Sequence, residues 1–234
     1  MMLQVRDLTA HYGTSQALFG MDFALQAGQV ATLLGRNGMG KTTTIHAIMG
    51  IVKASGGSIL FDGQELVGRP SFRTANLGIG LVPEGRQIFP NLTLMENLVA
   101  TASNHLGQAD PWSVEKVFAL FPELETRVGS MGNLLSGGEQ QMLAIGRALM
   151  TNPRLLILDE ATEGLAPLVR QKIWAALARI RAEGMSILVV DKNLADLLRI
   201  ADRHFIVQRG RVAWSGTSLE LQADAAVRAQ YLGF

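Results

Sequence analysis

The chain has 234 residues, of which 48% are apolar, 21 are Lys or Arg and 20 are Asp or Glu. This length can bury one large core with a small appended subdomain. The near-zero net charge disfavours a general nucleic-acid binder, and the absence of cysteine excludes a disulfide framework and a thiolate metal site. No apolar run approaches the length of a membrane span and no basic-then-apolar leader is visible, so we expect neither a span nor a secretion signal.

The N-terminal part of the chain has the pattern of strands and turns leading into one helix. Residues 3–34 alternate short apolar runs with turn residues, and the last six of them, 29–34, predict a buried strand. A helix is predicted over 41–49, ended by Gly50. Another short strand is predicted over 79–82.

Helical signals dominate the middle of the chain. Thr93 and Glu96 have the spacing of a capping box, in which each side chain satisfies a backbone N–H of the other residue. Asp110-Pro111 predicts the N-cap and the first residue of a further helix. We therefore expect a helical subdomain over residues 87–145.

Continuous apolar strands are predicted again at 155–158 and 186–190, with a helix between them. Strands of this kind that alternate with helices indicate an α/β fold whose mainly parallel sheet is covered on both faces. We expect a single domain over residues 1–234, with its core formed by residues 1–86 and 146–234.

A glycine-rich turn lies between the predicted strand over 29–34 and the helix that follows it. Gly35, four further residues, then Gly40-Lys41-Thr42 match the Walker A pattern. Its backbone amides and the helix N-terminus can surround phosphate oxygens, Lys41 can reach the β- and γ-phosphates, and the Thr42 hydroxyl can ligate Mg²⁺. The alternative is a turn that binds nothing, but the strand–turn–helix context favours a nucleotide site.

Two carboxylates follow the buried strand over 155–158. The C-terminal ends of strands in an open α/β sheet are where ligands bind, so Asp159 and Glu160 are placed to act on a bound nucleotide. Asp159 would hold Mg²⁺, and Glu160 would orient or deprotonate the attacking water. The alternative is an acidic cap of the next helix; beside a phosphate loop, the catalytic interpretation is favoured.

The heptapeptide Leu-Ser-Gly-Gly-Glu-Gln-Gln at residues 135–141 opens a predicted helix, and its Ser136 lies 23 residues before Asp159. A hydroxyl with unhindered backbone amides at the positive end of a helix makes a second anion site. The alternative is an ordinary capped helix start.

These elements, in this order, resemble the ATP-binding cassette (ABC) ATPases over nearly the whole chain, from Tyr12 onward. The resemblance implies a P-loop NTPase core, with a mainly parallel sheet, an N-terminal antiparallel β-subdomain and an inserted α-helical subdomain. It implies ATP and Mg²⁺ as cofactors, with Tyr12 stacked on adenine and with Thr42, Glu84 and Asp159 around the metal. The residues implied to bind the phosphates are Gly35, Asn37, Gly38, Met39, Gly40, Lys41, Thr42 and Thr43.

The resemblance also implies partners. Ser136, Gly137 and Gly138 would contact ATP held by a second cassette, so that two cassettes close around two ATP molecules. Residues 81–98 and 163–167 are similar in sequence to the cassettes for branched-chain amino acid uptake. Cassettes for urea or short amides share much of the same sequence.

That narrower likeness implies an ATP-hydrolysing subunit of an importer, held peripherally on the cytoplasmic face of the inner membrane. The expected partners are transmembrane permease subunits, a second and preferably different cassette, and a solute-binding protein reached indirectly, with no nucleic acid. By the same analogy, the segment 89–92 in a cleft around residues 84–97 would receive a helix of the permease; the alternative is a hydrophobic patch under the loop.

The chain departs from the usual ABC pattern at three positions. Glu84 stands where most members have Gln, Ala166 where most have Asp, and Lys192 where most have a switch histidine. We expect Lys192 to contact the γ-phosphate and to act in catalysis with Glu160 and Lys41; the alternative is a solvated lysine. Two other functions stay open: a soluble regulatory or DNA-repair ATPase, and an assembly subunit with little turnover, which Glu160 argues against.

Overall fold

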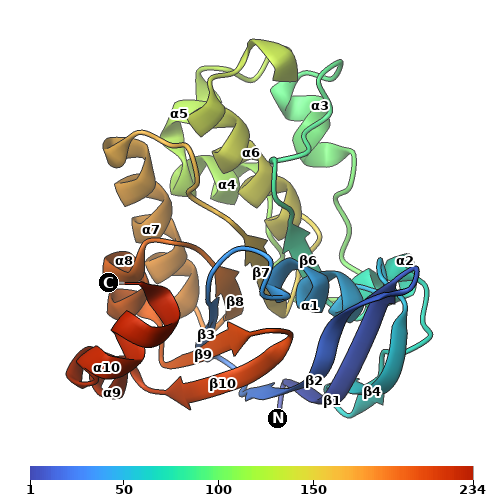
Figure 1. Cartoon of the computed structure of the whole chain (residues 1–234). Helices are drawn as coiled ribbons and strands as arrows, with labels where there is room; N and C mark the ends of the chain where they lie inside the picture. The colour runs from blue at the N-terminus through green and yellow to red at the C-terminus, as the bar shows by residue number, and fades with distance from the viewer. Residues whose placement is uncertain (234) are drawn as a thin grey trace.

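The computed structural model describes residues 1–233, which fold into two β-sheets and a lobe of helices (Figure 1). The strands are β1 (Leu3–Tyr12), β2 (Ser15–Leu25), β3 (Val30–Leu34), β4 (Ala54–Phe61), β5 (Gln64–Glu65), β6 (Ile79–Val82), β7 (Leu155–Asp159), β8 (Ser186–Val190), β9 (Arg203–Gln208) and β10 (Arg211–Gly216). The α-helices are α1 (Lys41–Ile48), α2 (Ser71–Asn76), α3 (Leu94–Val99), α4 (Val114–Leu120), α5 (Pro122–Glu125), α6 (Gly137–Leu149), α7 (Pro167–Ala182), α8 (Leu194–Ile200), α9 (Ser218–Ala223) and α10 (Ala225–Val227). Within residues 1–233, no helix has the length and hydropathy needed to cross a bilayer.

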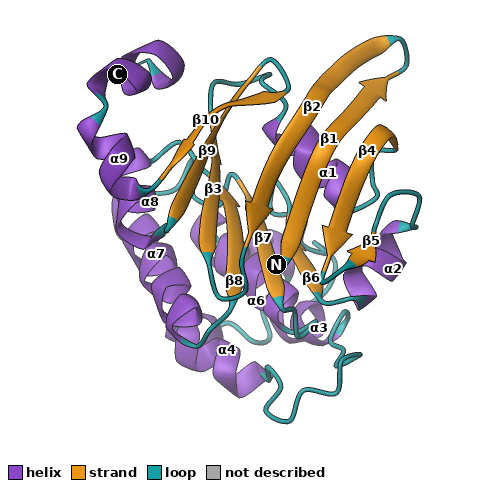
Figure 2. Cartoon of the chain, turned by 90° about the horizontal axis from the view of Figure 1, so that it is seen from below, coloured by secondary structure: helices purple, strands orange, loops and turns teal. Residues whose placement is uncertain are grey.

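The larger sheet has the strand order β10-β9-β3-β8-β7-β6 and is parallel except for β10. The smaller sheet, β2-β1-β4-β5, is antiparallel, and the two sheets lie side by side where the backbone N–H of Phe19 donates to Gly210 (Figure 2). Every residue of β3, β7 and β8 is buried, because both faces of these strands are covered. Their residues are accordingly apolar except Thr32, Asp159 and Ser186. The predicted P-loop NTPase core with an antiparallel β-subdomain is confirmed.

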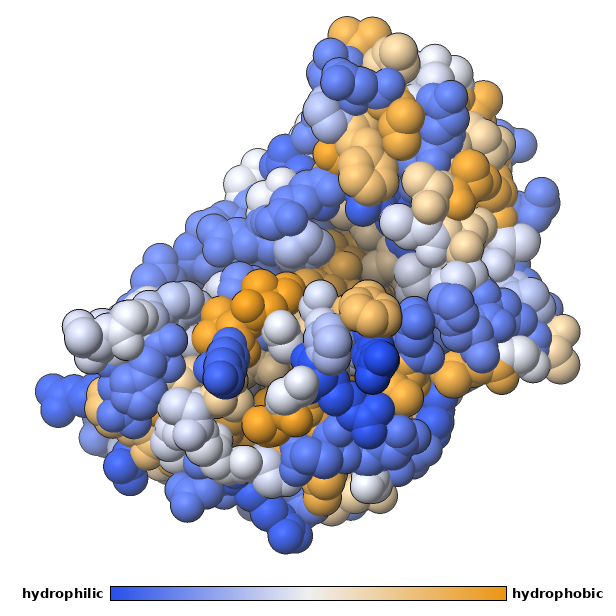
Figure 3. Space-filling model, turned by 90° about the vertical axis from the view of Figure 1, so that its right-hand side faces the viewer, coloured by the Kyte–Doolittle hydropathy of each residue, from blue (hydrophilic) through white to orange (hydrophobic). Residues whose placement is uncertain are grey.

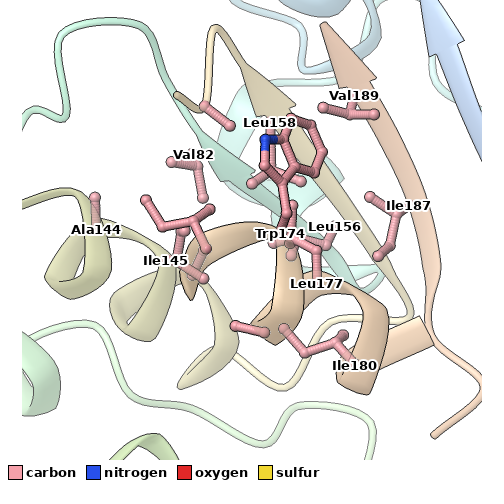
Figure 4. Close-up of a cluster of buried hydrophobic side chains, with 14 of the residues drawn as sticks. Val82, Ala144, Ile145, Leu156, Leu158, Trp174, Leu177, Ile180, Ile187 and Val189 are labelled. Atoms are coloured by element: carbon pink, nitrogen blue, oxygen red, sulfur yellow. The ribbon is translucent and has the colours of Figure 1, made fainter. Parts of the chain in front are cut away.

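Alternate residues of each central strand supply two separate apolar cores. In β7, Leu156 and Leu158 face the cluster formed with α6 and α7, whereas Leu155 and Ile157 face the cluster formed with α1 and the antiparallel sheet. Trp174 of α7 packs over the first cluster, with its exposed fraction only 5% (Figure 4). Because both cores share the same strands, the sheet fixes the strand ends that carry the site.

The helical lobe contains α3 to α6 (Figure 1). The predicted capping box at the start of α3 is present, since the Glu96 N–H donates to the Thr93 hydroxyl and the Thr93 N–H donates to the Glu96 carboxylate. The predicted subdomain boundary at residue 145 lies inside α6, and the division into residues 1–86, 87–145 and 146–234 stays a prediction.

One sequence prediction in this lobe is wrong. Asp110-Pro111 does not begin a helix; α4 begins at Val114 with Ser113 as its N-cap. The backbone N–H of Trp112 donates to the buried side chain of Asn152, 2.6 Å away, which holds the chain in a non-helical conformation past the proline. A long-range hydrogen bond therefore overrides the local signal.

A buried histidine should make the stability of the fold depend on pH. The ring nitrogens of His204 hydrogen-bond to the Thr32 and Ser218 hydroxyls, and burial lowers its pKa from 6.5 to about 4. The unfolded chain therefore binds this proton first, and the free energy of unfolding should fall by up to about 3 kcal/mol between pH 6.5 and pH 4. Urea unfolding at several pH values checks this.

The matched variants for that experiment are His204→Gln and His105→Gln. The first should flatten the pH dependence even if it lowers stability overall, whereas exposed His105 should leave the dependence unchanged. Equal pH slopes for wild type and His204→Gln would contradict the assignment.

Candidate functional site

The phosphate loop joins β3 to α1. Gly35 has φ +135° and Gly40 has φ +104°, both unfavourable for residues with a side chain. A Cβ atom at Gly35 would lie 2.4 Å from the Val207 carbonyl oxygen, and one at Gly40 would lie 2.9 Å from the Leu18 side chain. The glycines are therefore required for the loop to turn back against β9 and β2.

Lys41 is buried in this loop as the first residue of α1. Its ammonium donates to the carbonyl oxygens of Gly35 and Arg36, at 2.8 and 2.9 Å. Burial lowers the pKa of Lys41; nearby Asp159 opposes this shift and nearby Lys192 adds to it. The loop thus holds one lysine ammonium at its centre, where phosphate groups can be recognised.

A cleft of about 360 Å³ opens beside the loop. It brings together residues from five separate parts of the chain: Ala17 of β2, and four segments that follow the parallel strands β3, β6, β7 and β8. The C-terminal ends of parallel strands are where open α/β sheets bind ligands. The predicted site residues that line it are Asn37, Gly38, Gly40, Lys41, Thr42, Thr43, Glu84, Glu160 and Lys192.

Asp159, the last residue of β7, is buried at the base of this site. Among the residues that the structure describes, neither of its carboxylate oxygens has a hydrogen-bond partner. Burial raises the pKa of Asp159, and the nearby Glu84 carboxylate raises it further. Thr42, His46 and Lys41 lower this pKa, although Thr42 does not form a hydrogen bond with the carboxylate. An orphaned buried carboxylate close to a hydroxyl and a second carboxylate fits an oxygen-ligated divalent cation such as Mg²⁺.

Glu160 lies at the mouth of the cleft with its side chain 13% exposed. Its φ of +53° is sparsely populated for a non-glycine residue, and its N–H donates to the Val190 carbonyl oxygen, 2.9 Å away. Carboxylate oxygens of Glu84, Glu160 and Glu163 lie within 4.8 Å of one another. A carboxylate held in this way can accept a proton from a water molecule in the cleft.

Lys192 follows β8 and faces the same cleft. Its ammonium forms an ion pair with Glu163 and lies 3.8 Å from Glu160 Oε2. Contact of Lys192 with a γ-phosphate stays a prediction. Glu163 is a site residue that sequence reasoning missed. A signal was available: β7 and β8 are expected in one sheet, where Asp159 pairs with Val190, so the residues that follow these two strands lie close together.

Six of the predicted nucleotide-binding residues do not line this cleft. Tyr12 is half exposed at the end of β1, and Met39 accepts a hydrogen bond from the Arg209 N–H at its sulfur. Ser136 caps α6, beside Gly137 and Gly138, in the helical lobe. Their roles toward adenine, or toward a nucleotide held by a second subunit, stay predictions. Gly35 lies beside the cleft, where its carbonyl holds Lys41.

Known proteins resemble this chain in sequence and in fold. The ABC transporter family matches residues 18–163. The chain is 40% identical over 234 residues to the high-affinity branched-chain amino acid transport ATP-binding protein BraG of Pseudomonas aeruginosa, covering 99% of this chain and 100% of BraG. It is 31% identical to the lipopolysaccharide export system ATP-binding protein LptB of Haemophilus influenzae, covering 99% and 97%.

A solved structure is similar along the same length. The crystal structure of a nucleotide-free ATP-binding cassette from an ABC transporter superposes with a TM-score of 0.83 at 26% identity, covering 97% of this chain and 96% of the other. Family match, full-length relatives and shared fold all lead to one assignment. The chain belongs to the ABC transporter family of ATP-binding cassettes, which are ATPases coupled to transport.

Proposed function

We propose that the chain powers the import of branched-chain or other hydrophobic amino acids. The observation that carries this proposal is the 40% identity to BraG from end to end, against 31% for the export protein LptB. A cassette for urea or short amides, and a soluble ABC ATPase unconnected to transport, are the alternatives.

The cleft supplies the groups that ATP hydrolysis needs. Lys41 and the loop amides would bind the phosphates, and Thr42, Asp159 and Glu84 would hold Mg²⁺. When bound, Mg²⁺ would supply positive charge that stabilises the phosphate oxygens during transfer. Glu160 orients the attacking water and accepts its proton, because it is the cleft carboxylate held by the rigid end of β7.

A second cassette completes the site. Ser136, Gly137 and Gly138 open α6 with a serine cap and two glycines, and backbone amides at a helix N-terminus favour phosphate oxygens. They lie in the helical lobe, so in this proposal they reach the ATP of a partner cassette. In this proposal the partner cassette is a different protein, rather than a second copy of this chain.

The proposed assembly places the chain peripherally on the cytoplasmic face of the inner membrane. Its proposed partners are transmembrane permease subunits, with a solute-binding protein met only indirectly and no nucleic acid. Purifying the native complex through a tag on this chain tests the assembly, with membrane subunits and a second cassette expected by mass spectrometry. Recovery of the chain alone, or with only soluble proteins, would refute the transport role.

A groove between the lobes is the proposed seat of the permease. It has a volume of about 210 Å³ and its lining includes Leu81, Arg86 and Arg147; Figure 3 shows this side of the molecule hollowed below the upper lobe. Beside it, the Arg147 guanidinium lies 4.2 Å from the centre of the Phe89 ring. Buried Asn97 exchanges hydrogen bonds with the Phe89 backbone, at 2.8 and 2.9 Å. The loop is thus held rigidly with an aromatic ring exposed.

Charge substitution at this loop should impair assembly. Phe89→Glu combined with Leu92→Glu should reduce co-purification of the permease at least tenfold, because a buried charge at an apolar contact costs several kcal/mol. ATP binding should be unchanged. Leu219→Glu, a matched change at an exposed leucine on α9, should have no effect. Normal assembly of the double variant would refute docking at this loop.

A further inference from the structure

We propose that Glu163 is a positioning residue, which holds the Lys192 ammonium 3.8 Å from Glu160 Oε2 and keeps it from closing into hydrogen-bond contact with that carboxylate. The inference rests on the proposed role of Glu160 as proton acceptor. It adds a role for the contact between Lys192 and Glu163.

The backbone under these side chains is fixed by a buried contact. Asp191 accepts hydrogen bonds from the backbone N–H and the hydroxyl of Thr162, at 2.9 and 2.7 Å, and both residues are buried. Asp191 also accepts from the Asn193 N–H at 2.9 Å. The loops after β7 and β8 are therefore tied together, which brings the side chains of residues 163 and 192 to the same edge of the cleft.

The Lys192 ammonium has two carboxylates within reach. It is in contact with Glu163 and 3.8 Å from Glu160 Oε2. The Lys192 and Glu163 side chains are 54% and 48% exposed, whereas Glu160 is only 13% exposed. With the nearer carboxylate removed, the poorly hydrated Glu160 carboxylate would attract the ammonium with little screening by water. Without Glu163, Lys192 would move the remaining distance onto Glu160.

Such a contact would impair the reaction. The Lys192 ammonium would occupy a Glu160 oxygen that the attacking water needs. With Glu163 present, Lys192 keeps its positive charge in the cleft, where it is available to phosphate, and Glu160 keeps a free oxygen.

Steady-state MgATP hydrolysis by the full chain tests this with the variants Glu163→Gln, Lys192→Gln and the double variant. Glu163→Gln should lower kcat about tenfold or more, a partial loss of what a general base contributes, with KM for ATP within about twofold of wild type. Lys192→Gln should have the smaller defect. The double variant should recover from the level of Glu163→Gln to the level of Lys192→Gln, because the lysine that blocks Glu160 is gone.

This rescue separates positioning from mere structure. A structural ion pair predicts additive or equal losses, so a Glu163→Gln variant at least as active as Lys192→Gln, or a double variant no better than Glu163→Gln, would overturn the proposal. The exposed pair of Lys172 and Glu123 between α7 and α5 is the matched control, and Glu123→Gln should leave kcat unchanged. If Glu160→Gln hydrolyses ATP normally, the proposed role of Glu160 fails instead, and the two failures are distinguishable.

Discussion

Replacing Glu160 with Gln should lower the steady-state rate of ATP hydrolysis by roughly 10²- to 10⁴-fold, the usual contribution of a general base. The amide keeps the shape of the side chain in the cleft but cannot accept a proton. MgATP binding, followed by fluorescence or calorimetry, should be preserved, since the phosphate loop is untouched.

The control for this variant is Glu183→Gln, at an exposed carboxylate that ends α7. It should hydrolyse ATP at the wild-type rate. A chain that remains fully active with Glu160→Gln would show that another group takes the proton from water, and Glu84 and Glu163 would be the nearest candidates.

The second large effect is expected from Asp159→Asn, and it should have opposite signs for activity and for stability. Burial raises the pKa of Asp159 above that of the unfolded chain, so its ionised form destabilises the folded protein above that unfolded pKa. In chelator at neutral pH, the variant should therefore unfold at or above the wild-type temperature. Hydrolysis should fall roughly a hundredfold or more, because metal charge stabilisation is worth several kcal/mol.

Thermal unfolding with and without Mg²⁺ and ATP measures the effect on stability. MgATP should raise the unfolding temperature of wild type more than that of Asp159→Asn, because a ligand stabilises only the state that binds it. A variant that is less stable than wild type in chelator, or that is stabilised equally by MgATP, would contradict the assignment of Asp159 to the metal.

The parts of the site that could be predicted from the sequence are those carried by local patterns. The phosphate loop needs glycines where a Cβ would collide with β9 and β2, so the requirement is visible as spacing around Gly35 and Gly40. Asp159 ends β7 and Glu160 follows it, and the continuous apolar run before them shows where the strand ends. Of these four residues, Gly40 and Glu160 line the cleft, and the roles of all four stay predictions.

The remaining features depend on contacts between distant residues. The backbone N–H of Trp112 donates a hydrogen bond to the side chain of Asn152, forty positions away in the sequence. Because of this bond, the helix expected at Asp110-Pro111 does not begin there. Lys192 and Glu163 meet because β7 and β8 are neighbours in the sheet, a pairing that propensity alone does not specify. Tertiary contacts therefore determine where helices begin and which charged side chains pair, whereas the apolar periodicity of the sequence is enough to predict where the strands lie.

ATP-driven uptake by the reconstituted complex is the most direct test of the transport role. Proteoliposomes that contain the complex purified through this chain, with MgATP inside and a solute-binding protein outside, should accumulate labelled leucine and not urea. Uptake should stop when this chain carries Glu160→Gln, although the complex still assembles. Accumulation of urea instead of leucine, or leucine uptake that continues with Glu160→Gln, would contradict the proposed function.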